Sequence, residues 1–206
     1  MKKKQKHLLL DTIGTFFLIL GIIAIAKSMY RQTPNQILYM CYLGMILIGI
    51  GVLTKRSFII MSQVYILAIP LLVWDLDFLY WLIFNKPLWG ITDYFFSQPS
   101  LTLDKIITLQ HLFTVPLSIY AARLIGLKRK DAWIWSFVQI ILVFFMVNIL
   151  SSQEANINCG FSPCIDIYFG LPYELTWFLT FFGMTFISSL IINKMFFKKM
   201  FEKNNK

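Results

Sequence analysis

One histidine lies inside a long apolar stretch of the chain, on a stripe of polar side chains. His111 has Thr108 three residues before it and Thr114 three residues after it, so in a helix the three side chains share one face. An imidazole titrates near neutral pH and can accept or donate a proton, which suits it to acid–base chemistry. The other histidine, His7, belongs to a basic N-terminal segment. His111 is therefore the first candidate for chemistry within the apolar part of the chain.

Two carboxylates, Asp75 and Asp77, end the apolar run that precedes the run of His111. An ionised group in hydrocarbon costs about 2.5 to 3.5 kcal/mol on insertion scales, so each one is a candidate site residue by default. We expect His111 to act as a general base or proton shuttle whose charge is tuned by Asp75 or Asp77. The alternative is that His111 is a hydrogen-bonded packing residue that joins helices.

Three more polar residues are expected at the same depth. Asn148 lies near the end of the fifth apolar run, Asn158 in the loop after it, and Glu174 at the start of the sixth run. Together with Thr108 and Thr114 they are predicted to line a substrate-binding pocket that opens to the outside. The chain contains no GxSxG, HExxH, Walker or Rossmann motif, and we expect neither a metal site nor a cofactor.

Six apolar runs are each long enough to cross a hydrocarbon core of about 30 Å. They cover approximately residues 8–27, 36–54, 57–77, 104–124, 131–150 and 173–194. The chain is 58% hydrophobic and 14% charged, whereas soluble proteins carry roughly a quarter charged residues. We therefore predict an all-α integral membrane protein, in which residues 1–206 form a single bundle of six transmembrane helices in the cell membrane.

Lysine and arginine gather at one set of ends of these runs. If the N-terminus is cytoplasmic, 15 of the 19 basic residues lie in inside segments and four lie outside, namely Lys27, Arg31, Lys86 and Lys105. This bias predicts that both termini are cytoplasmic. The formal charge of +9 is carried in short clusters beside span ends, which are typical of topology signals and contacts with anionic lipids. Membrane lipids are the expected partners, and nucleic acid is not.

Two outer loops are long, at residues 78–103 and 151–172, and loops of that length are usually functional or disordered. The segment 74–84 is too apolar to float in water, so we interpret it as an extension of the third helix or as an interfacial helix. Cys159 and Cys164 lie in the second loop, on the oxidising side of the membrane. They either close a small disulfide loop or remain two free thiols.

The order of features from the fourth run to the sixth resembles that of a known family. A histidine followed by a proline (QHLFTVPLSIY) precedes Asn148, an asparagine-rich loop (NINCGF) and a Gly-x-Pro-Tyr opening of the last run (GLPYEL). This order resembles the YwaF-like group of small polytopic membrane proteins and, more remotely, the androgen-induced intramembrane lipid hydrolases. The segment GITDYFF with the NIN loop is also similar to a set of prokaryotic hypothetical membrane proteins.

The resemblance covers about half of the chain and implies a lipid-directed hydrolase or acyltransferase with His111 as the catalytic histidine. The hydrolases pair their histidine with a threonine nucleophile on an earlier helix. This chain has the acidic segment WDLD there, with Asp75 and Asp77. An acid–base role for the histidine, acting on water or on a substrate hydroxyl, fits these residues better.

Two other classes of function stay open. In a transporter of a small solute or of protons, the same groups would coordinate the cargo, and Pro70 and Pro116 would break helices, although the two halves of the chain do not match. In a non-catalytic membrane subunit, Gly44, Gly49 and Gly51 would form a close contact with a partner helix, although packing within the chain is the commoner role of such glycines.

Overall fold

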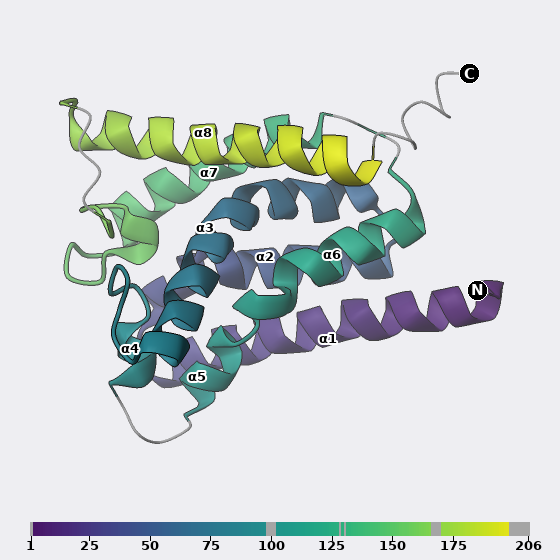
Figure 1. Cartoon of the computed structure of the whole chain (residues 1–206), viewed down its shortest axis with the longest axis horizontal. Helices are drawn as coiled ribbons and strands as arrows, with labels where there is room; N and C mark the ends of the chain where they lie inside the picture. Colours follow the sequence, from purple (N-terminus) through teal and green to yellow (C-terminus); the bar gives the residue numbers. More distant parts are fainter. Residues whose placement is uncertain (1, 98–101, 128, 130, 166–169, 198–206) are drawn as a thin grey trace.

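A computed structural model describes residues 2–97, 102–127, 129, 131–165 and 170–197 of the chain. Its regular secondary structure within these ranges is helical, without strands. The long helices run between the two ends of the molecule (Figure 1). The helix α1 (Lys3–Tyr30) begins and the helix α8 (Tyr173–Ile192) ends at the same end. Residues 98–101 and 166–169 of the two predicted outer loops, and the basic residues after 197, lie outside the described residues.

Four helical segments of the described chain are long and apolar enough to cross a membrane, judged by length and composition. They are α1, α3 (Ser57–Phe84), α7 (Ala132–Leu150) and the segment Tyr173–Phe197, in which α8 continues into a short π-helical turn, η3 (Asn193–Phe197). Large apolar side chains remain exposed on their outer faces, such as Leu142 and Leu190. This all-helical architecture with exposed apolar faces is compatible with a membrane protein.

The other two predicted spans are shorter helices. The helix α2 (Met40–Leu53) has 14 residues, which gives it a length of about 21 Å, and it follows a 3₁₀ turn, η1 (Pro34–Leu38). The predicted span 104–124 consists of two helices, α5 (Leu103–Thr108) and α6 (His111–Ile125). Between them the chain tightens, because the amides of residues 110, 112 and 113 each donate to a carbonyl three residues back.

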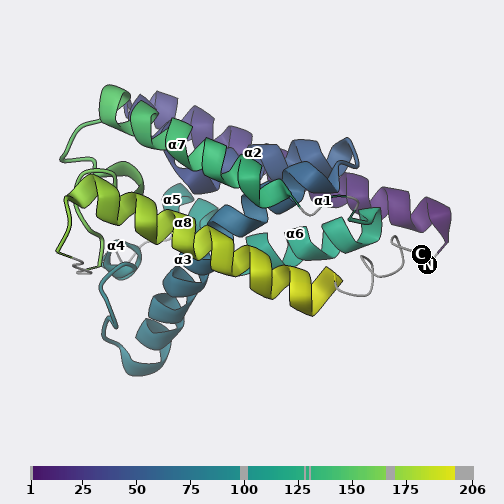
Figure 2. The same cartoon turned by 90° about the horizontal axis from the view of Figure 1, so that it is seen from above.

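The helix α3 is central to the molecule and bends midway (Figures 1 and 2). Pro70 lies inside it and removes one backbone hydrogen bond, which accounts for a bend at this position. The helix continues through Trp74 to Phe84 and ends at Asn85, whose φ of 53° is left-handed. The predicted extension of the third helix is therefore confirmed, and the bend directs this extension away from α8 (Figure 2).

Glycines allow α2 to pack closely against its neighbours in the chain. A Cβ atom added at Gly49 would lie 2.8 Å from the backbone nitrogen of Leu18 in α1. One added at Gly51 would lie 2.9 Å from the Ile60 side chain in α3. These two glycines therefore serve contacts within the chain, which is the commoner of the two roles considered for them.

Polar side chains also join α3 to α7 inside the bundle. The Gln63 amide donates to the Gln139 carbonyl at 2.7 Å, and Gln139 donates back at 3.0 Å. Ser136 donates its hydroxyl proton to the backbone carbonyl of Ser62 at 2.8 Å. Buried hydrogen bonds of this kind fix the rotation of one helix against the other. They hold the first half of α3 in place, so that its second half can carry the candidate site.

Candidate functional site

His111 is the first residue of α6, and its ring lies against α3. It packs edge-to-face on Trp74, with 4.8 Å between the ring centroids and 78° between the planes. Trp74 donates its indole N–H to the hydroxyl of Tyr94 at 3.0 Å, and Tyr94 belongs to the short helix α4 (Asp93–Phe96). The histidine is thus positioned by an aromatic wall that α3 and α4 supply.

The aromatic wall continues along α3 and α4. Phe78 stacks on Trp74 at 4.9 Å, and Phe95 meets Phe78 edge-to-face at 5.0 Å. Phe96 stacks on Trp81 at 4.0 Å. Aromatic pairs of these geometries contribute about 0.5–1.5 kcal/mol each beyond their buried area. The wall gives the site an apolar side beside its polar side chains.

Three buried polar atoms of α3 and the α5–α6 junction have no hydrogen-bond partner among the described residues. They are Nδ1 of His111, Nε2 of Gln110 and Oδ1 of Asp75. Gln110 is 1% exposed and lies next to His111 in the chain. A buried polar group without a partner costs about 1–3 kcal/mol, so native structures rarely keep one without a ligand or water nearby. Gln110 and His111 are consecutive residues at this junction, and their two unpartnered atoms define the candidate site. Asp75 lies next to Trp74 on α3.

Asp77 has a different role from the one considered for it. Its buried carboxylate accepts backbone N–H bonds from Leu88 at 3.0 Å, Trp89 at 2.7 Å and Thr92 at 2.8 Å. The hydroxyl of Thr92 donates a fourth bond at 2.7 Å. Within residues 2–97 and 102–127, no hydrogen bond or ion pair joins His111 to Asp77 or to Asp75. Asp77 therefore anchors the loop that carries α4, and it positions Tyr94 rather than His111.

The two threonines of the predicted stripe use their hydroxyl groups locally. Thr108 donates to the backbone carbonyl of Asp104 at 2.8 Å. The hydroxyl of Thr114 contacts both the backbone carbonyl and the side-chain carbonyl of Gln110. Thr114 thus turns the Gln110 side chain so that its carbonyl is satisfied while its amide nitrogen is not. These threonines support the α5–α6 junction beside His111.

The three remaining predicted residues do not join the His111 group by any hydrogen bond in the described structure. Asn148 donates to the carbonyl of Phe144 within α7, and Glu174 is exposed in the first turn of α8. Asn158 donates to the carbonyl of Leu38 at 2.8 Å and accepts from the amide of Met40 at 3.0 Å. Asn158 therefore ties the loop between α7 and α8 to the entrance of α2.

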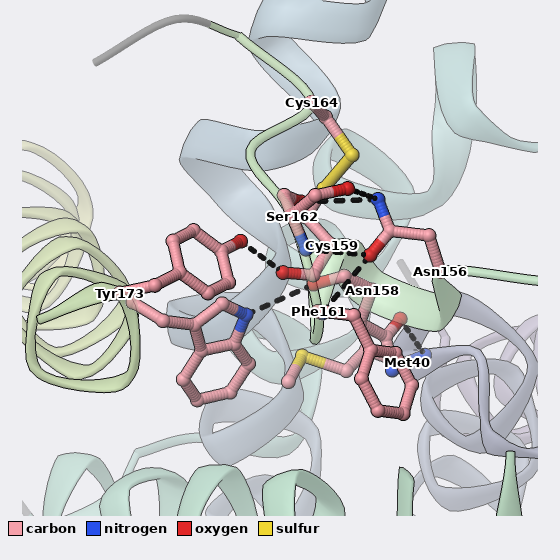
Figure 3. The surroundings of a disulfide bond; sticks show 9 residues. Met40, Asn156, Asn158, Cys159, Phe161, Ser162, Cys164 and Tyr173 are labelled. Carbon is pink, nitrogen blue, oxygen red and sulfur yellow. Dashed lines mark hydrogen bonds between the residues drawn. A yellow bond between two sulfur atoms is a disulfide. The ribbon is translucent and has the colours of Figure 1, made fainter. Parts of the chain in front are cut away.

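That loop is closed by a disulfide between Cys159 and Cys164 (Figure 3). Inside it, the carboxamide oxygen of Asn156 accepts from the amides of Phe161 and Ser162, both at 3.0 Å. Tyr173 at the start of α8 donates its hydroxyl proton to the carbonyl of Cys159 (Figure 3). The loop is a compact cap that links α2, α7 and α8, which explains its concentration of asparagine and cysteine.

Several contacts that build the site were not predicted. Trp74, Tyr94 and Gln110 received no individual role from the sequence. The signal that could have found Trp74 is its position three residues before Asp77 on one helix, since both side chains then meet the same loop.

Comparison of the chain with models of known families, with curated proteins and with solved structures finds no match. The described residues also contain no group of three or more His, Cys, Asp or Glu side chains that could hold a metal ion. The chemistry of the site is therefore the basis for its proposed function.

Proposed function

We propose that the chain crosses the membrane six times, with both termini in the cytoplasm, and that α2 and the α5–α6 pair are the two short crossings. Two observations support this arrangement. The basic residues at the start of α1, in the α2–α3 turn and in η3 belong to one end of the bundle (Figure 1). The disulfide belongs to the opposite end, and disulfides persist on the oxidising side of a membrane.

Reporter fusions test this topology. A reporter enzyme that works only in the cytoplasm should be active when it is fused after Lys130. A reporter enzyme that works only outside the membrane should be active when it is fused after Cys159. The reverse pattern would place the His111 site on the cytoplasmic side and overturn the arrangement.

The proposed activity is the hydrolysis or transfer of an ester in a lipid or lipid-like molecule at the outer side of the membrane. The observation that carries this proposal is the pair of unpartnered buried atoms on the neighbouring residues Gln110 and His111, together with the contact of the His111 ring with Trp74. A molecule that satisfies such a site needs a polar group for these atoms and an apolar part for the ring of Trp74. An amphipathic ester has both, and it reaches the site from the bilayer.

In the proposed reaction, neutral His111 accepts a proton from water or from an acceptor hydroxyl as that oxygen attacks the ester carbonyl. The amide of Gln110 donates to the carbonyl oxygen as its negative charge develops. The bond between the acyl carbon and the leaving oxygen then breaks, and the imidazolium returns the proton to the leaving alcohol. Asp75 is the carboxylate that remains for orienting the nucleophile, because Asp77 is engaged by the α4 loop.

Comparative lipidomics tests the activity. Cells that express the wild-type protein should show a change in at least one ester lipid, and cells that express His111→Ala at the same membrane level should not. His7→Ala is the matched control, because His7 lies in the N-terminal segment of α1 beside Lys55. Identical lipid profiles for wild type and His111→Ala, with both proteins folded, would remove the enzyme proposal.

Transport of a small solute or of protons is a second candidate function, and the interrupted helix favours it. The break between α5 and α6 lies directly beside His111, and discontinuous helices often form the binding sites of transporters. Deeper in the bundle, the hydroxyl oxygens of Ser118, Thr185 and Ser188 are also buried without partners among the described residues. A pH-sensitive dye inside reconstituted vesicles would report proton flux that His111→Ala abolishes if this function is the correct one.

A further inference from the structure

A second polar cluster lies away from His111, where the C-terminal end of α1 meets the start of α5. Lys27 and Arg31, one helical turn apart on α1, both form ion pairs with the carboxylate of Asp104. The Lys27 side chain is 9% exposed, whereas that of Arg31 is 52% exposed. Two cations face one carboxylate, so the cluster carries an excess positive charge.

These two cations line a groove with a volume of about 410 Å³ on the surface of the bundle. Its other lining residues are Ile23, Ala26, Tyr30 and Leu103. Ile23 and Leu103 are partly exposed, and Tyr30 is almost fully exposed at the rim. The groove is therefore apolar along its length and basic at one end. Its chemistry is complementary to that of an anionic amphiphile, which has an apolar chain and a negative head.

The placement of these cations is unusual for this chain. Under the proposed topology only four of 19 basic residues lie outside, and two of these four meet in one groove. One cation is enough to neutralise Asp104. The guanidinium of Arg31 has five N–H donors in a planar fork, and its N–H bond to Asp104, at 2.5 Å, uses one of them. The others suit a second anion, for which arginine is the preferred partner.

We propose that this groove binds an anionic phospholipid of the outer leaflet, with the headgroup phosphate at Arg31 and Lys27 and the first acyl carbons along Ile23 and Leu103. The choice of leaflet depends on the proposed topology, whereas binding itself does not depend on topology or on His111. The lipid would hold α1 against α5, the helix that directly precedes α6 and its first residue, His111.

Photo-crosslinking tests the proposal with purified full-length protein in vesicles of phosphatidylcholine. The probe is a photoactivatable phosphatidylglycerol, and peptide mass spectrometry counts its adducts on residues 19–31 and 102–108. Arg31→Gln should lower the labelling about five-fold, the ratio that one charge near a membrane surface is worth. The matched control is Lys86→Gln, which removes an outside basic residue that does not line the groove.

The decisive comparison is Asp104→Asn, because it breaks the same ion pairs while raising the net charge of the groove. The proposal predicts more labelling than in the wild type. If the cluster only ties α1 to α5, Asp104→Asn and Arg31→Gln would both reduce labelling or leave it unchanged, and the proposal fails. Displacement of the probe by inorganic phosphate at constant ionic strength would assign the site to free anions and also overturn it. His111→Ala should label like the wild type, so a failed enzyme proposal does not affect the result.

Discussion

The carboxylate of Asp77 gives a prediction that can be worked from the hydrogen bonds themselves. Its Oδ1 accepts from the amides of Leu88 and Trp89, and its Oδ2 accepts from the amide and hydroxyl of Thr92. In Asp77→Asn all four bonds lose the charge of their acceptor. The NH₂ group fits best at the Oδ2 position, because the Thr92 hydroxyl can turn there and accept from it, and the backbone amide of Thr92 then loses its acceptor.

Hydrogen bonds to a charged group contribute about 1.5–3 kcal/mol each, so the loss of one bond and the weakening of the other three should together remove about 3–6 kcal/mol from the docking of the loop. At 1.4 kcal/mol for each factor of ten, the population with the loop undocked rises at least about a hundred-fold. Chymotrypsin cleaves after aromatic residues, and Trp89 and Tyr94 lie in this segment. The cleavage rate at the segment 89–96, measured in detergent under native conditions, should rise by a comparable factor.

Asp75→Asn is the matched control, because Asp75 lies two residues away on α3 and its Oδ1 has no partner among the described residues. Its cleavage rate should stay close to that of the wild type. The reasoning is refuted if Asp77→Asn resists chymotrypsin as well as the wild type does, or if Asp75→Asn is equally sensitive.

Three further predictions concern the stability of the bundle, measured by unfolding in detergent. Cys159→Ser should lower the free energy of unfolding by about 2 kcal/mol, the chain-entropy value for a disulfide with a sequence separation of 5. Cys41→Ser, which changes a free thiol, should lower it by less, and equal losses would contradict the role of the disulfide. Gly49→Ala should cost about 1–3 kcal/mol, because its Cβ would lie 2.8 Å from the backbone of α1, and an unchanged midpoint would show that the helices do not pack so closely. Gln139→Leu should cost about 1–3 kcal/mol, because the buried Gln63 amide loses a hydrogen-bond partner. The double variant with Gln63→Leu should cost less than the sum of the two single variants, and strict additivity would show that the two side chains do not interact.

Features that depend on local composition were accessible from the sequence. The apolar character of residues 74–84 made an extension of α3 one of two alternatives, beside an interfacial helix, and in the structure α3 continues to Phe84. The short interval between Cys159 and Cys164 on the predicted outer side made a disulfide one of two alternatives, and the structure contains it. Each of these features follows from residues close together in the chain.

Features that depend on packing between distant segments were not accessible in the same way. The contact of His111 with Trp74 requires the bend of α3 and the break before α6, and residues 109 and 110 include neither glycine nor proline to signal that break. Asp77 was grouped with His111 because both are polar at one depth, but its four donors come from a loop whose backbone no local pattern predicts. The pairing of Arg31 with Asp104 joins residues 73 positions apart.

The proposed acid–base chemistry of His111 on an ester lipid can be measured in a defined system. The most direct measurement uses purified protein reconstituted in vesicles made from the ester lipids of the host membrane, with release of fatty acid or transfer of an acyl group followed by mass spectrometry. We expect turnover by the wild type and by His7→Ala, and loss of turnover in His111→Ala with unchanged folding. Equal turnover by His111→Ala and wild type, or none by a correctly folded wild type on any ester lipid supplied, would contradict it.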